Sequence, residues 1–295
     1  MDVEITKANG SSYRLSDHDV VIRDFVVSSI EMRPSYSGID GRHGYVDMGA
    51  TYGSRTIRIP FYLDAHDLLD VALLRDKLFE LVTDVDSFYI RELRRSKYAP
   101  MHVCDDGESD DYEDKYVGGK RYKVRLTSTA FEIEQMFTYG FGELTFETTD
   151  LPFSESIGTT ADIDSNGLRY SDELWSYGMG LLYDNESHRY THSSRSFEIY
   201  NAGNVPIHPF QQELKISILG AGKGFELRNR TTGDVFRLTD QINGVIVIDG
   251  ANITDNSIQA LRKTNRQFIT IAPGWNEFTQ NGTARISFDF RFYYL

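Results

Sequence analysis

Three glycines alternate at Gly220, Gly222 and Gly224, directly after the apolar run ELKISIL. Glycines in such a pattern can form a loop whose backbone amides hold a phosphate group, provided that a helix begins after the loop. Here the chain continues as GFELRNRTTGDVF, which is typical of a strand followed by a tight turn. The spacing is not GxGxxG and no Lys-Ser/Thr pair follows, so the pattern predicts a hairpin turn rather than a nucleotide site.

Two groups of side chains have the chemistry to bind a metal ion. His188 and His192 lie four residues apart behind Asp184, but their segment YDNESHRYTHSS is polar and unlike a helix, so we expect exposed loop histidines. The stretch 105–114 contains seven carboxylates in ten residues and lacks the ligand spacing of a calcium loop. It predicts a solvated hairpin tip or, alternatively, a surface that meets a basic partner or repels polyanions. Neither group predicts a metal or cofactor site.

The sequence gives no pattern that predicts catalysis. It has no GxSxG serine motif, and its single cysteine, Cys104, precedes the acidic stretch, where negative charge disfavours the thiolate. Glycosidases use two carboxylates that flank the sugar, and the sequence alone cannot show which of its many carboxylates would lie that far apart. We therefore expect a protein that is not an enzyme. Trp175 and Trp275 could stack on a saccharide, although large aromatic side chains of a sandwich more often belong to its core.

A glycine-rich stretch suggests another kind of contact. Gly41, Gly44, Gly49 and Gly53 fall within thirteen residues, and the following RTIRIPFYL alternates apolar and polar residues as a half-buried strand does. Because no helix follows directly, the stretch lacks the means to hold a phosphate. Its glycines mark positions where the chain turns sharply or where another backbone approaches. We expect a flexible loop next to a strand.

The remaining patterns predict a mainly β protein with one helix. The helix follows a candidate N-cap at Asp64 or Asp67. Its apolar residues at helical spacing are Leu68, Leu69, Ala72, Leu78, Leu81 and Val82. Strands are expected at 88–93, 120–135 and 142–149, and then, after a linker at 151–167, at 196–201, 213–219, 224–229, 234–238, 244–250, 268–271 and 284–294. In the last run, alternate residues from Ala284 to Phe292 are apolar, which is typical of an antiparallel sandwich with one buried face per sheet.

Length and composition restrict the class of protein. A chain of 295 residues has room for two domains, and its 18 Phe and 18 Tyr are typical of strand-rich folds. The formal net charge of −13 repels phosphate backbones and anionic membranes, so we expect no specific nucleic-acid binding. The single cysteine and the polar start MDVEITKANG indicate folding in a reducing cytoplasm. No window of 18 apolar residues occurs, so membrane insertion is not expected.

Three stretches, in this order along the chain, together resemble the distal tail protein (Dit) family of long-tailed phages, the siphoviruses, that infect Gram-positive bacteria. The early stretch is GIDGRHGYVDMGATYGSRTIRIPFYL, and the middle one is FEIYNAGNVPIHPFQQELKI. The late one combines ELRNRTTGDVF, VIVIDGAN and APGWNEF. The middle stretch is the most specific, because a turn from Asn201 to Asn204 is followed by Pro206 and Pro209 before the next strand. The match covers most of the chain outside about 155–195.

The resemblance implies a β-rich ring-forming domain at 1–152, with one α-helix and an arm at about 88–125, and a galectin-like antiparallel β-sandwich at 153–295. It implies a homo-hexameric hub in the tail tip, or baseplate. Such a hub joins the tail tube protein to the tail-associated lysin or fibre protein and carries receptor-binding proteins for host attachment. The family implies no catalytic residue and no cofactor.

On this view Gly41, Gly44, Gly49 and Gly53 contact a neighbouring subunit, and the segment 159–192 contacts a phage-specific neighbour. The protein is expected in the tail tip of the virion, after synthesis in the host cytoplasm. Excess negative charge in the ring lumen would let DNA pass without adhering. The alternative is a carbohydrate-binding module whose sandwich grips host cell-wall polysaccharide through Trp175 and Trp275.

Overall fold

The computed structural model describes residues 1–295 except for 96–115, 128–129, 169–173, 177, 182–187 and 243. The expectations for Cys104, for Asp184 and for the acidic stretch 105–114 therefore lie outside the described residues, as does part of the arm predicted at about 88–125. The backbone divides into two compact units, Met1–Ser154 with Leu295 and Glu155–Tyr294. The assignment of a ring-forming domain to 1–152 and of a second domain to 153–295 stays a prediction.

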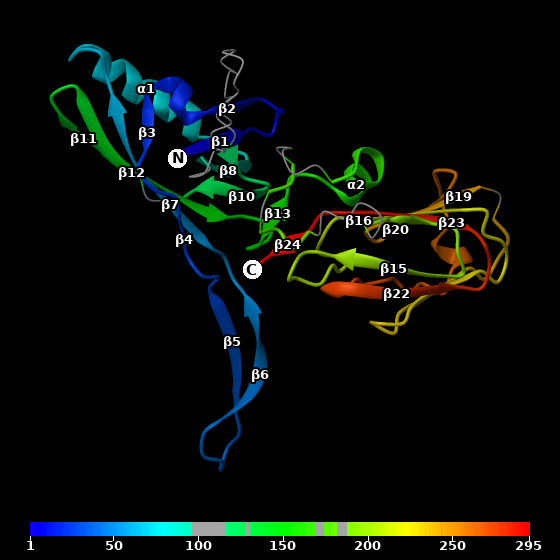
Figure 1. Cartoon of the computed structure of the whole chain (residues 1–295). Coiled ribbons are helices and arrows are strands. Elements are labelled where there is room, and N and C mark those ends of the chain that lie inside the picture. Colours follow the sequence, from blue (N-terminus) through cyan, green and yellow to red (C-terminus); the bar gives the residue numbers. More distant parts are fainter. Residues whose placement is uncertain (96–115, 128–129, 169–173, 177, 182–187, 243) are drawn as a thin grey trace, which may run out of the picture. The chain divides into compact units, whose positions relative to one another are not determined.

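The first unit is built around one antiparallel sheet. Its described strands are β1 (Asp2–Thr6), β2 (Ser12–Arg14), β3 (Val20–Ile22), β4 (Val26–Val27), β5 (Met32–Gly38), β6 (Tyr45–Tyr52), β7 (Thr56–Asp64), β8 (Phe88–Arg95), β9 (Tyr116–Val117), β10 (Lys120–Leu126), β11 (Ile133–Met136) and β12 (Tyr139–Thr148). Its helices are the 3-10 helix η1 (Leu15–His18) and α1 (Asp70–Val82). The sheet runs in the order β2-β1-β8-β10-β12-β7-β3, while β5 and β6 form a separate hairpin (Figure 1).

Strand β7 shows why this sheet has one buried face. Its residues alternate between core and surface over nine positions, as the sequence predicts. The buried members are Ile57, Ile59, Phe61 and Leu63. Along β12, β7 occupies one edge, and β10 and β11 share the other. The single strand predicted at 120–135 is therefore wrong, because it forms two strands that pair with different parts of β12.

The predicted helix is confirmed, but part of its predicted apolar face is wrong. The helix begins at Asp70, and the Asp67 carboxylate accepts hydrogen bonds from the amides of Leu69 and Asp70 at 2.7 and 3.1 Å. The predicted residues that enter the core are Leu78, Leu81 and Val82. Those that stay exposed are Leu68, Leu69 and Ala72. The two leucines precede the helix, so helical spacing does not apply to them.

The second unit contains two antiparallel sheets. Its strands are β13 (Ser154–Ser156), β14 (Thr191–His192), β15 (Ser196–Asn201), β16 (Leu214–Leu219), β17 (Glu226–Asn229), β18 (Val235–Arg237), β19 (Val245–Asp249), β20 (Asn252–Asp255), β21 (Ile258–Gln259), β22 (Gly274–Gln280), β23 (Arg285–Phe290) and β24 (Tyr293–Tyr294). Its helices are α2 (Thr160–Asn166) and the 3-10 helix η2 (Leu261–Lys263). The six-stranded sheet has the order β14-β23-β16-β19-β20-β21, and the four-stranded sheet has the order β15-β22-β17-β18.

Aromatic side chains join these two sheets into the predicted sandwich. Phe197 and Phe278 come from the four-stranded sheet, and their rings stack at 5.5 Å between centroids. Phe288 comes from the six-stranded sheet and lies 5.0 Å from Phe278. The alternation predicted from Ala284 to Phe292 is confirmed, since every second residue of that run is buried. The protein is mainly β, as its composition indicates.

Three local predictions in this unit are wrong. The segment read as a linker contains α2, which begins with a capping box between Thr159 and Asp162. The glycines of the GAGKG motif do not form a hairpin turn, because β16 and β17 on either side of them belong to different sheets. The strand expected at 268–271 is absent, since its backbone pairs only at the bridge between Ile271 and Ile207.

Candidate assembly surface

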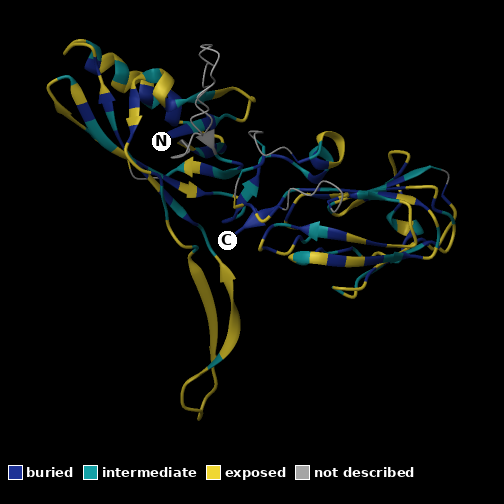
Figure 2. Ribbon diagram, viewed as in Figure 1, coloured by how far each residue is buried: buried dark blue, intermediate teal, exposed yellow. Residues whose placement is uncertain are grey.

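The β5–β6 hairpin has no layer of the described chain packed over it. Its strands pair from Met32–Tyr52 to Gly38–Tyr45, with a bulge between Pro34 and Tyr36. Every residue of the two strands is exposed except the half-buried Val46 (Figure 2). An isolated two-stranded hairpin is only marginally stable in water and needs other structure packed against it. The β5–β6 hairpin has no such packing within the described residues.

Large apolar side chains lie along the hairpin. They are Met32, Tyr36, Ile39, Tyr45, Met48 and Tyr52. Tyr45 is 77% exposed, and its ring lies 6.2 Å from the ring of Tyr36 across the two strands. A contiguous group of exposed apolar residues marks a surface that another molecule covers. The hairpin therefore has the composition of an interface.

The structure revises the prediction of a flexible glycine loop. Residues 45–52 of the glycine-rich stretch form strand β6, so only Gly41 and Gly44 lie in the connection between the strands. Gly41, Gly44 and Gly49 have φ values of +81°, +80° and +94°, which favour glycine over other residues. A Cβ atom on Gly53 would lie 2.5 Å from the Oε2 atom of Glu31. The glycines shape an extended hairpin, and their contact with another subunit stays a prediction.

The base of the hairpin is anchored to the first unit. The amide of Gly53 donates to the Glu31 carbonyl at 2.7 Å, and the amide of Glu31 donates to the Ser54 carbonyl at 3.0 Å. The Arg33 guanidinium donates a hydrogen bond to the Glu31 carboxylate, and this bond lowers the pKa of that carboxyl. The ring of Tyr52 packs edge-on against Phe153 at 5.7 Å. These contacts fix where the hairpin begins, whereas its strands beyond them remain uncovered.

The two tryptophans proposed for saccharide stacking have different surroundings. Trp175 is 2% exposed and packs against Phe292 at 5.9 Å, so the structure corrects its prediction: a covered ring cannot stack on a sugar. Trp275 is 41% exposed and lies 4.9 Å from Tyr200. His188 stacks on Trp275 at 6.0 Å and also contacts Tyr200 at 5.1 Å, so the three rings form one cluster. Burial of His188 also corrects the expectation that it is an exposed loop residue.

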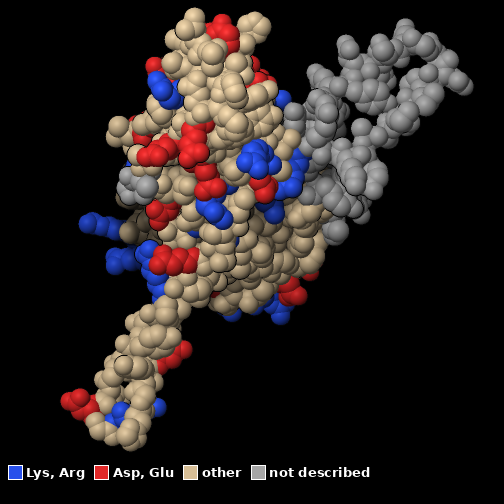
Figure 3. All heavy atoms as spheres, turned by 90° about the vertical axis from the view of Figure 1, so that its left-hand side faces the viewer, with Lys and Arg blue, Asp and Glu red and all other residues tan. Residues whose placement is uncertain are grey.

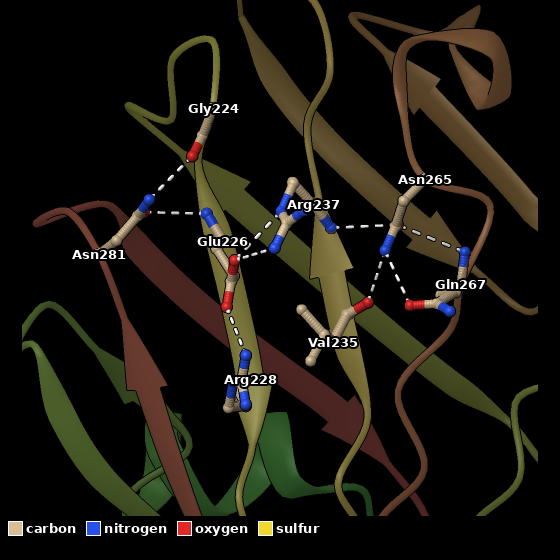
Figure 4. Close-up of polar contacts among 8 residues, drawn as sticks. All are labelled: Gly224, Glu226, Arg228, Val235, Arg237, Asn265, Gln267 and Asn281. Carbon is tan, nitrogen blue, oxygen red and sulfur yellow. Dashed lines mark hydrogen bonds and ion pairs between the residues drawn. The ribbon is translucent and has the colours of Figure 1, made fainter.

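Sequence reasoning did not identify a polar network at the edge of the four-stranded sheet (Figure 4). The Glu226 carboxylate on β17 pairs with Arg228 at 3.1 Å and with Arg237 on β18 at 2.6 Å. Asn265 accepts a hydrogen bond from the Arg237 amide at 3.1 Å and donates to the Val235 carbonyl at 2.7 Å. The Asn265 backbone amide also donates to the Arg237 carbonyl at 2.9 Å. Asn265 thus forms hydrogen bonds with the backbone of the edge strand β18 that a neighbouring strand would otherwise form.

The described residues also give no candidate metal centre. Within the described residues, no three His, Cys, Asp or Glu side chains come together as ligands. In that same part of the chain, no helix has the length and apolar character needed to cross a lipid bilayer. The hairpin therefore remains the surface whose composition most clearly indicates a partner.

A family model supplies the identification of the first unit. Residues 8–148 match the family described as phage tail protein RIFT-related domain, a range that includes the whole hairpin. This chain carries a phage tail protein domain. This match agrees with the resemblance to phage tail proteins that the sequence indicated. No curated protein sequence matches the chain.

Solved structures extend the likeness to both units. The SPP1 Dit (gp 19.1) protein, described as a paradigm of hub adsorption apparatus in phages that infect Gram-positive bacteria, has a TM-score of 0.61 at 12% identity. The alignment covers 99% of this chain and 98% of that protein, so this chain and SPP1 Dit share a fold. A chain of the phage P2 baseplate in its activated conformation with Ca aligns over 99% of this chain and 97% of its own length, with 11% identity and a TM-score of 0.40.

Proposed function

We propose that this protein is the hub of a siphophage tail tip and that it assembles as a homo-hexameric ring through the β5–β6 hairpin. The observation that carries the proposal is the exposed apolar surface of that hairpin in a chain that carries a phage tail protein domain. The number of six subunits comes from the resemblance to distal tail proteins. The role is structural and requires no catalytic residue and no cofactor.

In a closed ring, each subunit contacts its two neighbours through two different surfaces. One surface of each subunit binds the other surface of the next subunit. A projecting hairpin suits this arrangement, because it can reach a neighbour while its base stays hydrogen-bonded to its own unit. Tyr36, Tyr45 and Met48 would then lose water on contact with the next subunit. Gly41, Gly44, Gly49 and Gly53 belong to this contact as residues that shape the hairpin backbone.

The hub would join the tail tube protein to the tail-associated lysin or fibre protein and carry receptor-binding proteins for attachment to the host. It would reach the virion tail tip after synthesis in the host cytoplasm. We further propose that the lumen of the ring carries part of the net charge of −13, so that DNA passes without adhering. A ring structure whose lumen is lined by lysine and arginine would contradict the lumen proposal alone.

Light scattering and electron microscopy on the purified full chain test the ring. We expect a single species of about six chains for the wild type and smaller species for the double variant Tyr36→Ser, Tyr45→Ser. Ile258→Ser is the matched control, because Ile258 is an exposed apolar residue of the second unit and should leave the ring intact. Rings of normal mass in the double variant would show that the hairpin is not the subunit contact.

A second candidate function is carbohydrate binding by the sandwich. The observation that favours it is the partly exposed ring of Trp275, which packs against Tyr200 and His188 and presents an apolar surface to solvent. Calorimetric titration of the full chain with purified cell-wall polysaccharide tests it. Heat of binding that disappears in Trp275→Ala supports the site, and no heat with the wild type argues against it.

A further inference from the structure

A second group of exposed apolar residues lies at one end of the first unit, away from the hairpin. We call it the apolar tip. Its members are Leu68, Leu69, Leu73, Met136, Phe137 and Tyr139. Leu69 is 82% exposed and Phe137 is 80% exposed. The segment before α1 and the β11–β12 turn meet here, since the amide of Ala65 donates to the carbonyl of Thr138 at 3.1 Å (Figures 1 and 2).

The backbone conformation at Phe137, in the centre of the apolar tip, favours glycine over phenylalanine. Met136 and Tyr139 pair across the turn, so Phe137 is the first of only two residues in it. Phe137 has a φ of +54°, a conformation that glycine adopts readily and that strains other residues. A large apolar ring thus stands at a strained, solvent-exposed position where glycine would fold more easily. Folding alone does not account for a phenylalanine at this position.

The charged residues of the two segments that meet at the tip are acidic, and the first basic residue of α1, Arg75, forms an ion pair with Asp76 at 3.5 Å. Asp64, Asp67, Asp70 and Glu134 belong to the same two segments, and the Asp64 position pairs with Tyr139 in the sheet. The sequence contains no lysine or arginine in residues 59–74 or 126–168. Figure 3 shows this side of the first unit as largely uncharged surface that carries both acidic and basic side chains. Tip-to-tip pairing of two copies would bring these carboxylates together, and phosphate groups of nucleic acids or anionic lipids would be repelled.

We infer that the apolar tip is a docking knob for another protein of the tail, whose surface offers an apolar pocket bordered by lysine or arginine. This inference rests on the proposed function as a tail protein, and it adds a contact distinct from the hairpin. Phe137 and Leu69 would fill the pocket, and the surrounding carboxylates would pair with its basic border. Charge complementarity therefore selects a different protein rather than a second copy.

The test uses the phage that encodes this chain, with Phe137→Gly introduced into the full-length protein. Glycine relieves the positive φ, so the purified variant should melt at or above the wild-type temperature and form oligomers of unchanged mass. We expect it to be lost from purified tails, with a fall in infectious titre of about tenfold or more. Val85→Gln is the matched control, because Val85 is an exposed apolar residue of the same unit outside the tip and should leave the titre unchanged. Glu134→Lys should also lower the titre, since it reverses a charge of the border.

Each outcome has a separate meaning. Normal tails and titre for Phe137→Gly would overturn the docking knob while leaving the proposed function intact, provided that the wild-type protein is found in tails. A change in oligomer mass for Phe137→Gly would also overturn it, because the tip would then be a contact between copies. Absence of the wild-type protein from purified tails would instead refute the proposed function itself.

Discussion

Within the described residues, the β5–β6 hairpin and the edge strand β18 both have strand edges without a neighbouring strand, but only the edge of β18 is hydrogen-bonded by another part of its unit. At β18, Asn265 supplies hydrogen bonds to Arg237 and Val235, so the edge is closed from within the unit. The hairpin receives no such cover along its strands. An edge that is closed is protected from pairing with other chains, and an edge left open with apolar side chains is available for assembly.

The two regions also differ in where their apolar side chains are covered. Phe197, Phe278 and Phe288 are buried between the sheets of the sandwich, whereas Tyr36 and Tyr45 of the hairpin remain in solvent. Since burial of apolar surface drives both folding and association, the sandwich gains this energy within one chain. The hairpin gains it only when another molecule covers it. Mutations in the two regions should therefore affect different measurements.

The largest expected effect is loss of assembly from a change in the hairpin backbone. Gly49 has a φ of +94° within β6, so Gly49→Val should distort the strand and abolish ring formation while the stability of the monomer changes little. Light scattering measures the ring, and denaturant unfolding measures the monomer. Gly10→Val is the matched control, because Gly10 has a φ of +86° in the turn before β2 and lies outside the hairpin. Equal loss of rings in both variants would show that strain in general, and not the hairpin, is responsible.

A cavity in the sandwich should give the largest change in folding stability. Phe288→Ala removes a fully buried ring next to Phe278, and we expect a loss of about 3–5 kcal/mol in the free energy of unfolding. Tryptophan fluorescence in denaturant reports on this unit, since both tryptophans, Trp175 and Trp275, belong to it. Phe210→Ala should cost far less, because Phe210 is exposed. A loss of similar size in both variants would contradict the assignment of the core.

Opening the closed edge should have an intermediate effect. Asn265→Ala removes the two side-chain hydrogen bonds, from the Arg237 amide and to the Val235 carbonyl, and we expect a loss of about 1–2 kcal/mol together with increased aggregation. Unfolding curves and light scattering over time measure the two effects. Gln267→Ala leaves both edge bonds in place and serves as the control. An Asn265→Ala protein that stays free of aggregates would mean that the edge is protected by other features.

The smallest expected effect is a dependence on pH near the β17–β18 turn. Partial burial raises the pKa of the Asp234 carboxyl, but hydrogen bonds from Thr270 and Thr232 outweigh it and lower the pKa below its ordinary value. A lowered pKa means that the stability from Asp234 is present above about pH 4 and is lost as the pH falls through the folded-state pKa. Asp234→Asn should therefore lower the melting temperature at pH 7 and reduce the difference between pH 7 and pH 3. An unchanged pH profile in the variant would contradict this role.

Local patterns in the sequence predicted much of the fold. The alternation in β7 and from Ala284 to Phe292 identified half-buried strands, because side chains of a strand point to opposite faces regardless of what covers them. The helix after Asp67 was also legible, since its cap and spacing are local. The hairpin was misread as a flexible loop because glycine is common in turns, although Gly49 lies within a strand. Nothing in its pattern indicated that both faces would stay exposed.

The sequence by itself determined a mainly β protein with one helix in its first unit, an antiparallel sandwich and a resemblance to distal tail proteins. Only the tertiary structure decided which apolar residues are covered: Leu78 is buried and Leu69 is exposed, although both are leucines near the same helix. It also separated Trp175 from Trp275 and brought Asn265 to the edge of β18. The physical reason is that propensity and alternation act between neighbours in the chain, whereas burial depends on segments that only folding brings together.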